Sequence, residues 1–328
     1  MTRSPLTLAA LATSAVAGLD VINTQGFGSP GGEFDAAILT GRDGRHWIIR
    51  VPRSPAAELE QSADLVALRA LSAGARSRLP FAISTFAGQV PVGDTRAVVS
   101  EFVYGSKVSL SAMSLELASS IGAAIAAIHS LPPNLVIDAG LPSHSPVETL
   151  RAVVTLMDRA AATGLVPAGL LARWERATEE TMMWQFTPTV VNGGVASDSF
   201  LANGDEVTGM LGWHGLRVGD PAADLQWLAG SGLDQLADAA FASYSHARGN
   251  VDRQLRQRAS LLAELEIARW LLHGTETRST EIVDDAVGML SALVDDVHLD
   301  MTNPIGGATM PLGVDEVEAL LERTSHIH

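Results

Sequence analysis

The side chains best suited to chemistry are concentrated between residues 190 and 225, which read VVNGGVASDSFLANGDEVTGMLGWHGLRVGDPAADL. This stretch holds four aspartates and one histidine that could act as general bases or bind a divalent cation: Asp198, Asp205, Asp220, Asp224 and His214. Local structure accounts for three of the carboxylates. Asp220 precedes a proline at a helix start, where an N-cap is expected, Asp205 lies in the turn NGDE, and Asp224 is expected to bond the backbone one turn later.

A small α+β lobe is predicted for residues 1–104. It begins with a helix that has Ser4 as its N-cap and Pro5 at its first position. The β-rich runs FDAAILTG and RHWIIRVP are joined by the hairpin signal GRDG, and the Gly-rich loop QGFGSPGGE precedes them. A helix is predicted after Pro55, and RAVVSEFVYG is predicted to be a buried strand that ends at Gly105.

A larger, mainly helical lobe is predicted for residues 105–300. The helix in LELASSIGAAIAAIHSL ends before two prolines, and several amphipathic helices follow it. An island of short strands, PTVV, SFLAN and EVTGMLGW, interrupts these helices. Residues 301–328 read as a Gly/Pro-rich linker and a short C-terminal helix, so the sequence predicts an α+β fold with two lobes and a tail.

Composition excludes several classes of function. The 328 residues are 47% hydrophobic and 18% charged, which is typical of a globular protein. A formal net charge of −15 argues against nucleic acid or an anionic membrane as a partner. There is no cysteine, which excludes disulfides, thiolate catalysis and Cys-ligated zinc, and no His-x-x-x-His pair is present among the nine histidines.

The first residues, MTRSPLTLAALATSAVAGLDV, resemble a weak signal peptide, but the apolar positions are diluted by Ala, Thr and Ser. We interpret them as the N-terminal helix. No run approaches the roughly 18 apolar residues that a membrane-spanning helix needs. The expected location is the cytoplasm.

The order of the elements resembles the aminoglycoside and macrolide phosphotransferase family over about residues 15–295. The similar features are RHWIIRVPRSP, the following helix, a hinge strand, AAIHSLP and the island that ends in VGDPAADL. RVPRSP and the helix that contains WER are similar to macrolide-type members in particular. The resemblance implies a two-lobed protein-kinase-like fold, phosphoryl transfer to a hydroxyl group, and ATP or GTP as the cofactor.

The resemblance also implies a set of nucleotide-binding residues. Arg50 stands where kinases place a lysine on the phosphates, and Asp64 stands where the following helix supplies its acidic partner. An ordinary surface ion pair is the alternative interpretation of these two residues. Gly28 belongs to the Gly-rich loop that would cover the phosphates, and Glu101 and Phe102 would form the hinge beside the base.

The chain departs from the family at the positions that carry the chemistry. The three polar positions of the family loop H-G-D-x-x-x-x-N fall on Asn192, Gly194 and Ser199, and the metal-binding Asp falls on Gly212, directly before Trp213. Glycine cannot orient a hydroxyl group or hold a cation with a side chain, and a neutral serine hydroxyl is a weak Mg²⁺ ligand. No catalytic or metal-binding residue is therefore assigned, and Mg²⁺ binding is not expected.

Three hypotheses follow. The first is a pseudokinase, impaired in catalysis, that keeps a nucleotide or small-molecule site and regulates a partner. The second is an active ATP-dependent O-phosphotransferase, macrolide- or aminoglycoside-like, that uses displaced groups from among Asp198, Asp205, Asp220 and His214. The third is a protein-interaction module that uses the helix around Trp270. A small-molecule ligand or a protein partner is expected, and neither nucleic acid nor a membrane is.

Overall fold

The computed structural model describes residues 3–28 and 31–299, with side chains described as far as residue 295. The chain divides into two compact units. The first contains residues 1–153 and 184–263, and the second contains residues 154–183 and 264–328. This division follows the contacts of the chain. The boundaries at residues 104 and 300 stay a prediction, and the short C-terminal helix predicted beyond residue 300 lies outside the described residues.

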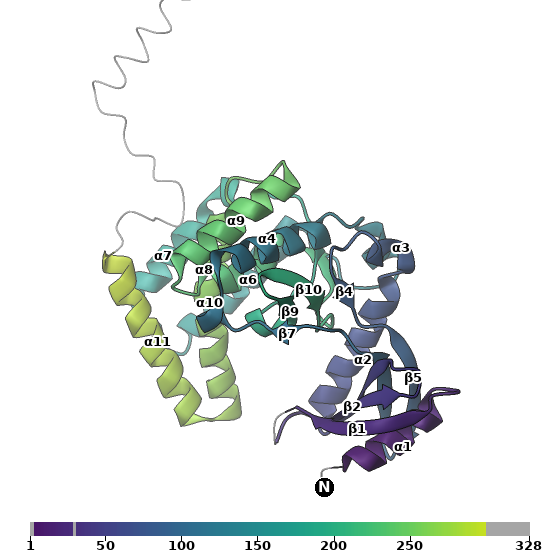
Figure 1. Ribbon diagram of the computed structural model, residues 1–328. Coiled ribbons are helices and arrows are strands. Elements are labelled where there is room, and N and C mark those ends of the chain that lie inside the picture. Colours follow the sequence, from purple (N-terminus) through teal and green to yellow (C-terminus); the bar gives the residue numbers. More distant parts are fainter. Residues whose placement is uncertain (1–2, 29–30, 300–328) are drawn as a thin grey trace, which may run out of the picture. The chain divides into compact units, whose positions relative to one another are not determined.

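The N-terminal lobe contains a five-stranded antiparallel sheet in the order β1-β2-β3-β6-β5. Its strands are β1 (Val21–Phe27), β2 (Phe34–Gly41), β3 (His46–Pro52), β5 (Phe86–Val92) and β6 (Thr95–Glu101). Helix α1 (Pro5–Ala15) covers one face of this sheet (Figure 1). The side chain of Ser4 accepts a hydrogen bond from the backbone N–H of Thr7, so the predicted N-cap is confirmed.

Alternation along β3 separates a core face from a functional face. Trp47, Ile49 and Val51 are buried in the cluster that packs against α1, whereas His46, Ile48 and Arg50 are partly exposed. Successive side chains of a strand point to opposite faces, so Arg50 lies on the face away from α1.

Helix α2 (Pro55–Ala70) contacts β3 and supplies Asp64, and the short helix α3 (Ala73–Arg76) follows it. Leu65 and Leu68 of α2 are buried, as the apolar spacing predicts, but Leu59 is 72% exposed. The predicted strand after residue 95 ends at Glu101 and not at Gly105. The N–H of Phe102 still donates to the carbonyl of His46, but β3 begins at His46, so the residues after Phe102 have no further β3 residue to pair with.

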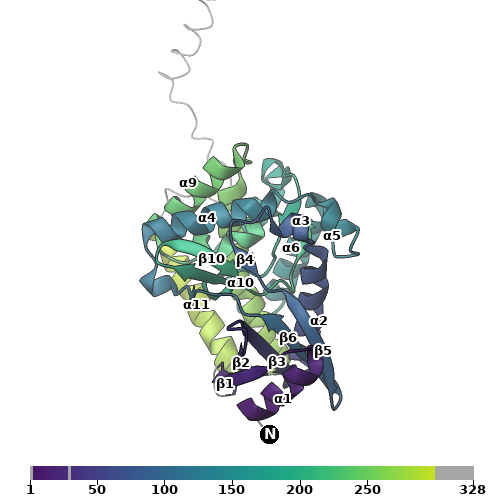
Figure 2. The ribbon, with the colours of Figure 1, turned by 45° about the vertical axis from the view of Figure 1, so that its right-hand side comes forward.

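The remainder of the first unit carries two small sheets, with orders β4-β10-β9-β7 and β11-β8. These strands are β4 (Ala82–Ile83), β7 (Ser106–Lys107), β8 (Thr189–Val191), β9 (Phe200–Asn203), β10 (Glu206–Met210) and β11 (Arg217–Gly219). Figure 2 shows helix α4 (Leu115–His129) lying over β10 and β4. The hairpin β9–β10 is the predicted strand island, with the turn NGDE at its tip.

Helix α4 packs closely against α9 (Asp234–Arg248). Gly122 makes this approach possible, because an added Cβ atom would lie 2.1 Å from the carbonyl oxygen of Ala240. The other helices of the first unit are α5 (Asn134–Ile137) and α8 (Gln226–Ala229), with 3-10 turns η1 (Leu110–Ala112), η2 (Thr181–Trp184), η3 (Ser197–Ser199) and η4 (Pro221–Asp224). Of these, η2 begins in the second unit.

The second unit is helical. It contains α7 (Ala168–Glu179) and α11 (Thr280–Leu299), while α6 (Pro146–Ala161) and α10 (Leu255–Thr277) are shared between the units. The carboxylate of Glu264 accepts hydrogen bonds from Arg173 and from the indole N–H of buried Trp174. The predicted α+β class, with a small β-rich lobe and a large helical lobe, is thus confirmed. Within the described residues, no helix is long and apolar enough to cross a membrane.

Candidate functional site

Arg50 and Asp64 form the ion pair that the sequence predicts. The Nη2 atom of Arg50 lies 3.3 Å from Oδ2 of Asp64. The Asp64 side chain is only 10% exposed and that of Arg50 is 34% exposed, so one edge of the guanidinium is open to solvent. The guanidinium carbon also lies 5.1 Å from the centre of the Phe34 ring, which restricts its position further.

Asp64 also connects the small lobe to the metal-binding segment of the family pattern. Its Oδ1 atom accepts the backbone N–H of Trp213 at 2.7 Å. Since Trp213 directly follows Gly212, one buried carboxylate holds both Arg50 and this segment. The pair is therefore partly buried and connected to a distant segment, which an isolated surface ion pair would not be, and its role toward a nucleotide stays a prediction.

Asp224 bonds the backbone of the loop that the resemblance aligns with the family's catalytic loop. Its two oxygen atoms accept the backbone N–H groups of Asn192 and Gly193, each at 2.7 Å. His129 contributes a third contact, from Nε2 to Oδ2 at 3.1 Å, and its Nδ1 atom lies 2.8 Å from the hydroxyl oxygen of Tyr244. Asp224 bonds the backbone, as the sequence predicts. Burial raises the pKa of Tyr244, so its hydroxyl group stays protonated.

The positions that depart from the family pattern lie close together in space. The side-chain amide of Asn192 donates to the carbonyl of Gly212 at 2.8 Å and accepts the N–H of Gly194 at 3.3 Å. The N–H of Leu211 donates to the carbonyl of Ser199 at 2.9 Å. The four residues that the resemblance aligns with the family's loop and metal-binding positions thus lie in one region of the structure, and their catalytic assignment stays a prediction.

The donor set does not fit Mg²⁺, which prefers an octahedron of oxygen ligands that includes carboxylates. Gly194 and Gly212 have no side-chain oxygen, and the hydroxyl oxygen of Ser199 already accepts the N–H of Ala196 at 3.1 Å. Among residues 3–28 and 31–299, no group of three or more His, Asp or Glu side chains could hold a metal ion.

The carboxylates that could substitute for the lost ones are held by other partners. Asp198 is exposed and pairs with Lys107 at 3.2 Å, and Asp205 accepts the hydroxyl of Ser114. Asp220 caps η4 through the N–H of Ala222, as the sequence predicts, and it also pairs with buried Arg258 at 2.8 Å. The sequence predicts a turn role for Asp205 and a cap role for Asp220. It does not predict the side-chain partners of the three aspartates, which are distant in the chain.

His214 is the candidate that the structure brings to the site. A Cβ atom added to Gly194 would lie 3.7 Å from Nε2 of His214. The imidazole, which belongs to an exposed residue, is therefore next to the family's catalytic position. The position of Gly194 is sterically open, and Gly212 has no heavy atom within 4 Å of an added Cβ, although its φ of +74° lies in the left-handed region.

The other residues that the resemblance assigns to a nucleotide lie on the sheet that carries Arg50 or next to it. Phe27 pairs with Ala36, which pairs with Arg50, so Gly28 follows a residue two strands from Arg50, roughly 10 Å across the sheet. Gly28 is exposed and has φ +99°. Glu101 ends β6 and pairs with Arg45, and Phe102 begins the connection to the second lobe.

Sequence reasoning did not single out Arg217. Its Nη1 atom donates to the carbonyls of Gly193 and Gly215, each at 3.1 Å, and so connects the catalytic-type loop to the segment that contains His214. Gly193 has φ +80°, and an added Cβ would collide with this guanidinium. The requirement for glycine at position 193 depends on its contact with Arg217, which lies 24 residues later in the chain. The sequence alone does not show this contact.

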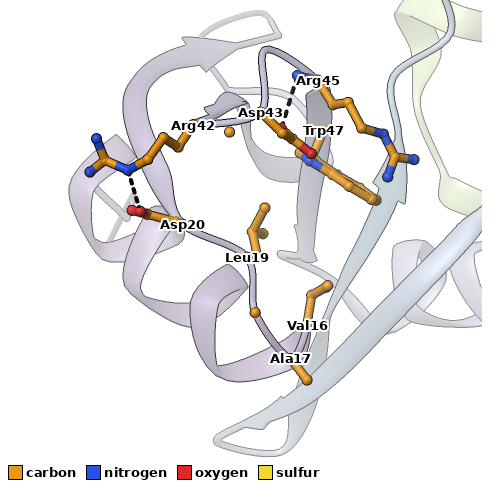
Figure 3. Close-up of a pocket in the computed structure, with 10 residues that line it drawn as sticks. Val16, Ala17, Leu19, Asp20, Arg42, Asp43, Arg45 and Trp47 are labelled. Atoms are coloured by element: carbon orange, nitrogen blue, oxygen red, sulfur yellow. Dashed lines mark hydrogen bonds and ion pairs between the residues drawn. The ribbon is translucent and has the colours of Figure 1, made fainter.

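A separate hollow of about 510 Å³ lies in the N-terminal lobe between the end of α1 and the β2–β3 turn. Figure 3 shows Arg42 paired with Asp20, and Arg45 beside the Trp47 ring, 4.5 Å from its centre. Trp47 lies on the face of β3 opposite to Arg50. This hollow is therefore not part of the site described above.

Comparisons with known proteins agree with this arrangement. A model of the phosphotransferase enzyme family matches residues 28–271. The fold is similar to that of a macrolide 2′-phosphotransferase from Brachybacterium faecium in its apoenzyme form, with a TM-score of 0.71 and 20% identity over 88% of this chain and 98% of that one. It is also similar to an aminoglycoside 2′-phosphotransferase-IIIa in complex with GDP, with a TM-score of 0.71 and 16% identity over 90% and 99% of the two chains. No curated protein matches the chain.

The fold is thus the two-lobed protein-kinase-like fold, with a β-rich N-terminal lobe and a mainly helical C-terminal lobe. The chain belongs to the phosphotransferase enzyme family.

Proposed function

We propose that this protein is a pseudokinase of the phosphotransferase family, which keeps the ligand-binding cleft and has lost phosphoryl transfer. The observation that carries the proposal is the side-chain content of the site. Gly194 and Gly212 occupy the positions of the two essential carboxylates, and the nearby candidates Asp198, Asp205 and Asp220 are bonded to other groups.

Magnitudes favour a loss of catalysis over a moderate reduction. A positioned acid–base group is typically worth about 10²–10⁴-fold in rate. Charge stabilisation by a metal ion adds several kcal/mol, and about 1.36 kcal/mol corresponds to a factor of ten. Without both, transfer is expected to be slower by many powers of ten.

The retained parts support ligand binding. The contacts of Asp64 with Arg50 and with the Trp213 backbone restrain Arg50, which the resemblance aligns with the cation that meets phosphates in kinases. Similar structures contain GDP or ADP, and another contains GDP with kanamycin. We therefore assign ATP or GTP, or a hydroxylated small molecule, as the ligand class, a regulatory role toward a partner as the function, and the cytoplasm as the location.

A working phosphotransferase is the second candidate, and His214 is the observation that favours it. Its Nε2 atom lies beside Gly194, where an imidazole could accept a proton from a hydroxyl group. This candidate requires Mg²⁺-dependent nucleotide turnover that is abolished by Arg50→Ala and reduced by His214→Asn. Such turnover in the purified protein would overturn the pseudokinase proposal.

The interaction module receives limited support. Trp270 is 38% exposed on α10, but its indole N–H is bonded to Asp285 at 2.8 Å and its ring stacks on His273. The Trp270 side chain is therefore held by contacts within its own unit. Such an internally bonded ring gives little support for a protein-binding surface.

The decisive experiment is the double reversion Gly194→Asp, Gly212→Asp. Space is available at both positions, and aspartate is among the residues that tolerate the left-handed conformation of residue 212. We expect Mg²⁺-dependent transfer from ATP to a panel of hydroxylated antibiotics to appear, measured by mass spectrometry of the products. The matched control is Gly194→Asn, Gly212→Asn, which has the same shape without the charges and should stay inactive. Wild-type activity equal to that of the reverted protein would contradict the proposal.

A further inference from the structure

We infer that the cleft binds its nucleotide as the metal-free anion, so that Mg²⁺ weakens binding where it strengthens binding in a metal-dependent kinase. This inference rests on the proposed function and concerns the same site. It predicts a sign for the effect of Mg²⁺ that a merely inactivated kinase with an intact metal site would not show.

The first step concerns the metal ligands. A nucleotide-bound Mg²⁺ is normally held to the protein by one or two carboxylates, which this site does not supply. Ser199 retains an oxygen atom, but it accepts the N–H of Ala196 and is fixed within its own turn. A cation brought in by the nucleotide would therefore gain no charged protein ligand here.

The second step concerns Arg50. Within the described residues its guanidinium has one hydrogen-bond partner, Asp64, which is used by Nη2. The second oxygen of Asp64 is occupied by the Trp213 N–H, so the carboxylate is held in place and in turn fixes the arginine. An arginine carries five donors in a planar fork that matches two phosphate oxygens, whereas a lysine acts as a point charge. Arg50 can hold a phosphate group directly.

The third step is the charge of the site. Replacement of two carboxylates by Gly194 and Gly212 removes two negative charges that would otherwise repel a bare phosphate chain. The imidazole of His214 remains beside Gly194. At the preceding Gly193, the half-buried guanidinium of Arg217 bonds the carbonyl and the buried carboxylate of Asp224 accepts the N–H, so these two charges oppose each other. Mg²⁺ in solution would compete with Arg50 for the same phosphate oxygens, and the site offers it nothing in return.

The test is a calorimetric titration of the full-length protein with ATP, first in EDTA and then in Mg²⁺. If only metal-free ATP binds, the apparent Kd rises by the inverse of the metal-free fraction. At a free Mg²⁺ concentration 100 times the dissociation constant of the Mg–ATP complex, the increase is about 100-fold. AMP, which holds Mg²⁺ weakly, is the matched control and should bind equally in both buffers.

Two variants complete the experiment. Arg50→Lys keeps the charge and loses the fork, so affinity in EDTA should fall. Ser199→Asn, Gly212→Asp restores metal ligands, so Mg²⁺ should now strengthen ATP binding. Stronger or equal binding of ATP by the wild type in Mg²⁺, or no binding in either buffer, overturns the inference. Neither result affects the loss of transfer, which is measured separately as turnover.

Discussion

At the scale of single residues, acidic groups with structural partners are present and those with chemical roles are absent. Asp224 is fully buried and holds two backbone N–H groups of the catalytic-type loop, and Asp64 holds Arg50 and a backbone N–H. In contrast, Gly194 and Gly212 occupy the positions that the resemblance aligns with two carboxylates of the reaction. Under the proposed function, the acids that hold the backbone are kept and those that serve only the reaction are absent.

The structural weight of Asp224 can be measured. In Asp224→Asn one backbone N–H faces an amide NH₂ in place of an oxygen, and a buried charge-assisted contact is lost. We expect the free energy of unfolding to fall by about 3 kcal/mol in urea denaturation.

Asp198→Asn is the matched control, because its exposed pair with Lys107 is worth less than about 1 kcal/mol. If the two substitutions lower the free energy of unfolding equally, the bonds from Asp224 to the backbone of residues 192 and 193 contribute little to stability.

At the scale of elements, the candidate site depends on short strands that pair with each other and pack against a long helix. The strands β8 and β11 pair through Val191 and Arg217 and frame the loops on either side. Helix α4 supports this region and reaches α9 at Gly122, where the two backbones come too close for any side chain.

Gly122→Ala should therefore destabilise the protein, since the nearest atoms to the new methyl group belong to the Ala240 backbone and cannot turn away. We expect a loss of about 2 kcal/mol in urea unfolding followed by circular dichroism.

The matched control has the opposite sign. Gly288 lies exposed within α11 with open space around it, and Gly288→Ala should stabilise the protein by about 0.5–1 kcal/mol. A neutral result at Gly122 would mean that the α4–α9 contact adjusts without cost.

How much of this could be predicted from the sequence depends on the distance along the chain. Ser4 and Asp220 were predicted as caps because the signal lies within a few residues. The bond from Trp213 to Asp64 spans 149 positions, and that from Lys107 to Asp198 spans 91. Such pairings are determined by the packed fold and leave no local pattern. The resemblance therefore predicted the candidate site residues and the pair of Arg50 with Asp64, but not the bond of Asp64 to Trp213 or the pair of Asp198 with Lys107.

At the scale of the whole molecule, charge is the dominant property. A formal net charge of −15 on a chain of 328 residues opposes compaction through mutual repulsion. Salt screens this repulsion, because the Debye length falls from roughly 30 Å at 0.01 M to roughly 8 Å at 0.15 M.

We therefore expect the urea midpoint of unfolding at pH 7 to rise when NaCl is increased from about 10 to 150 mM, over the range in which screening reaches molecular dimensions. The same comparison at pH 5, close to the sequence pI of about 4.9, should show little change. A midpoint that falls with salt at pH 7 would indicate that local ion pairs outweigh the net repulsion.

The pair between Lys107 and Asp198 has a practical consequence. Lys107 is the only lysine of the chain, and it lies in β7. Strand β7 pairs with β9, whose first residue directly follows Ser199. Apart from the terminal amine, an amine-selective reagent therefore has a single target, which is exposed and adjacent to the strand island. A fluorophore attached there would test, without any engineered residue, whether ligands bind near the strand island, and the rate of its attachment would depend on how often the lysine leaves Asp198.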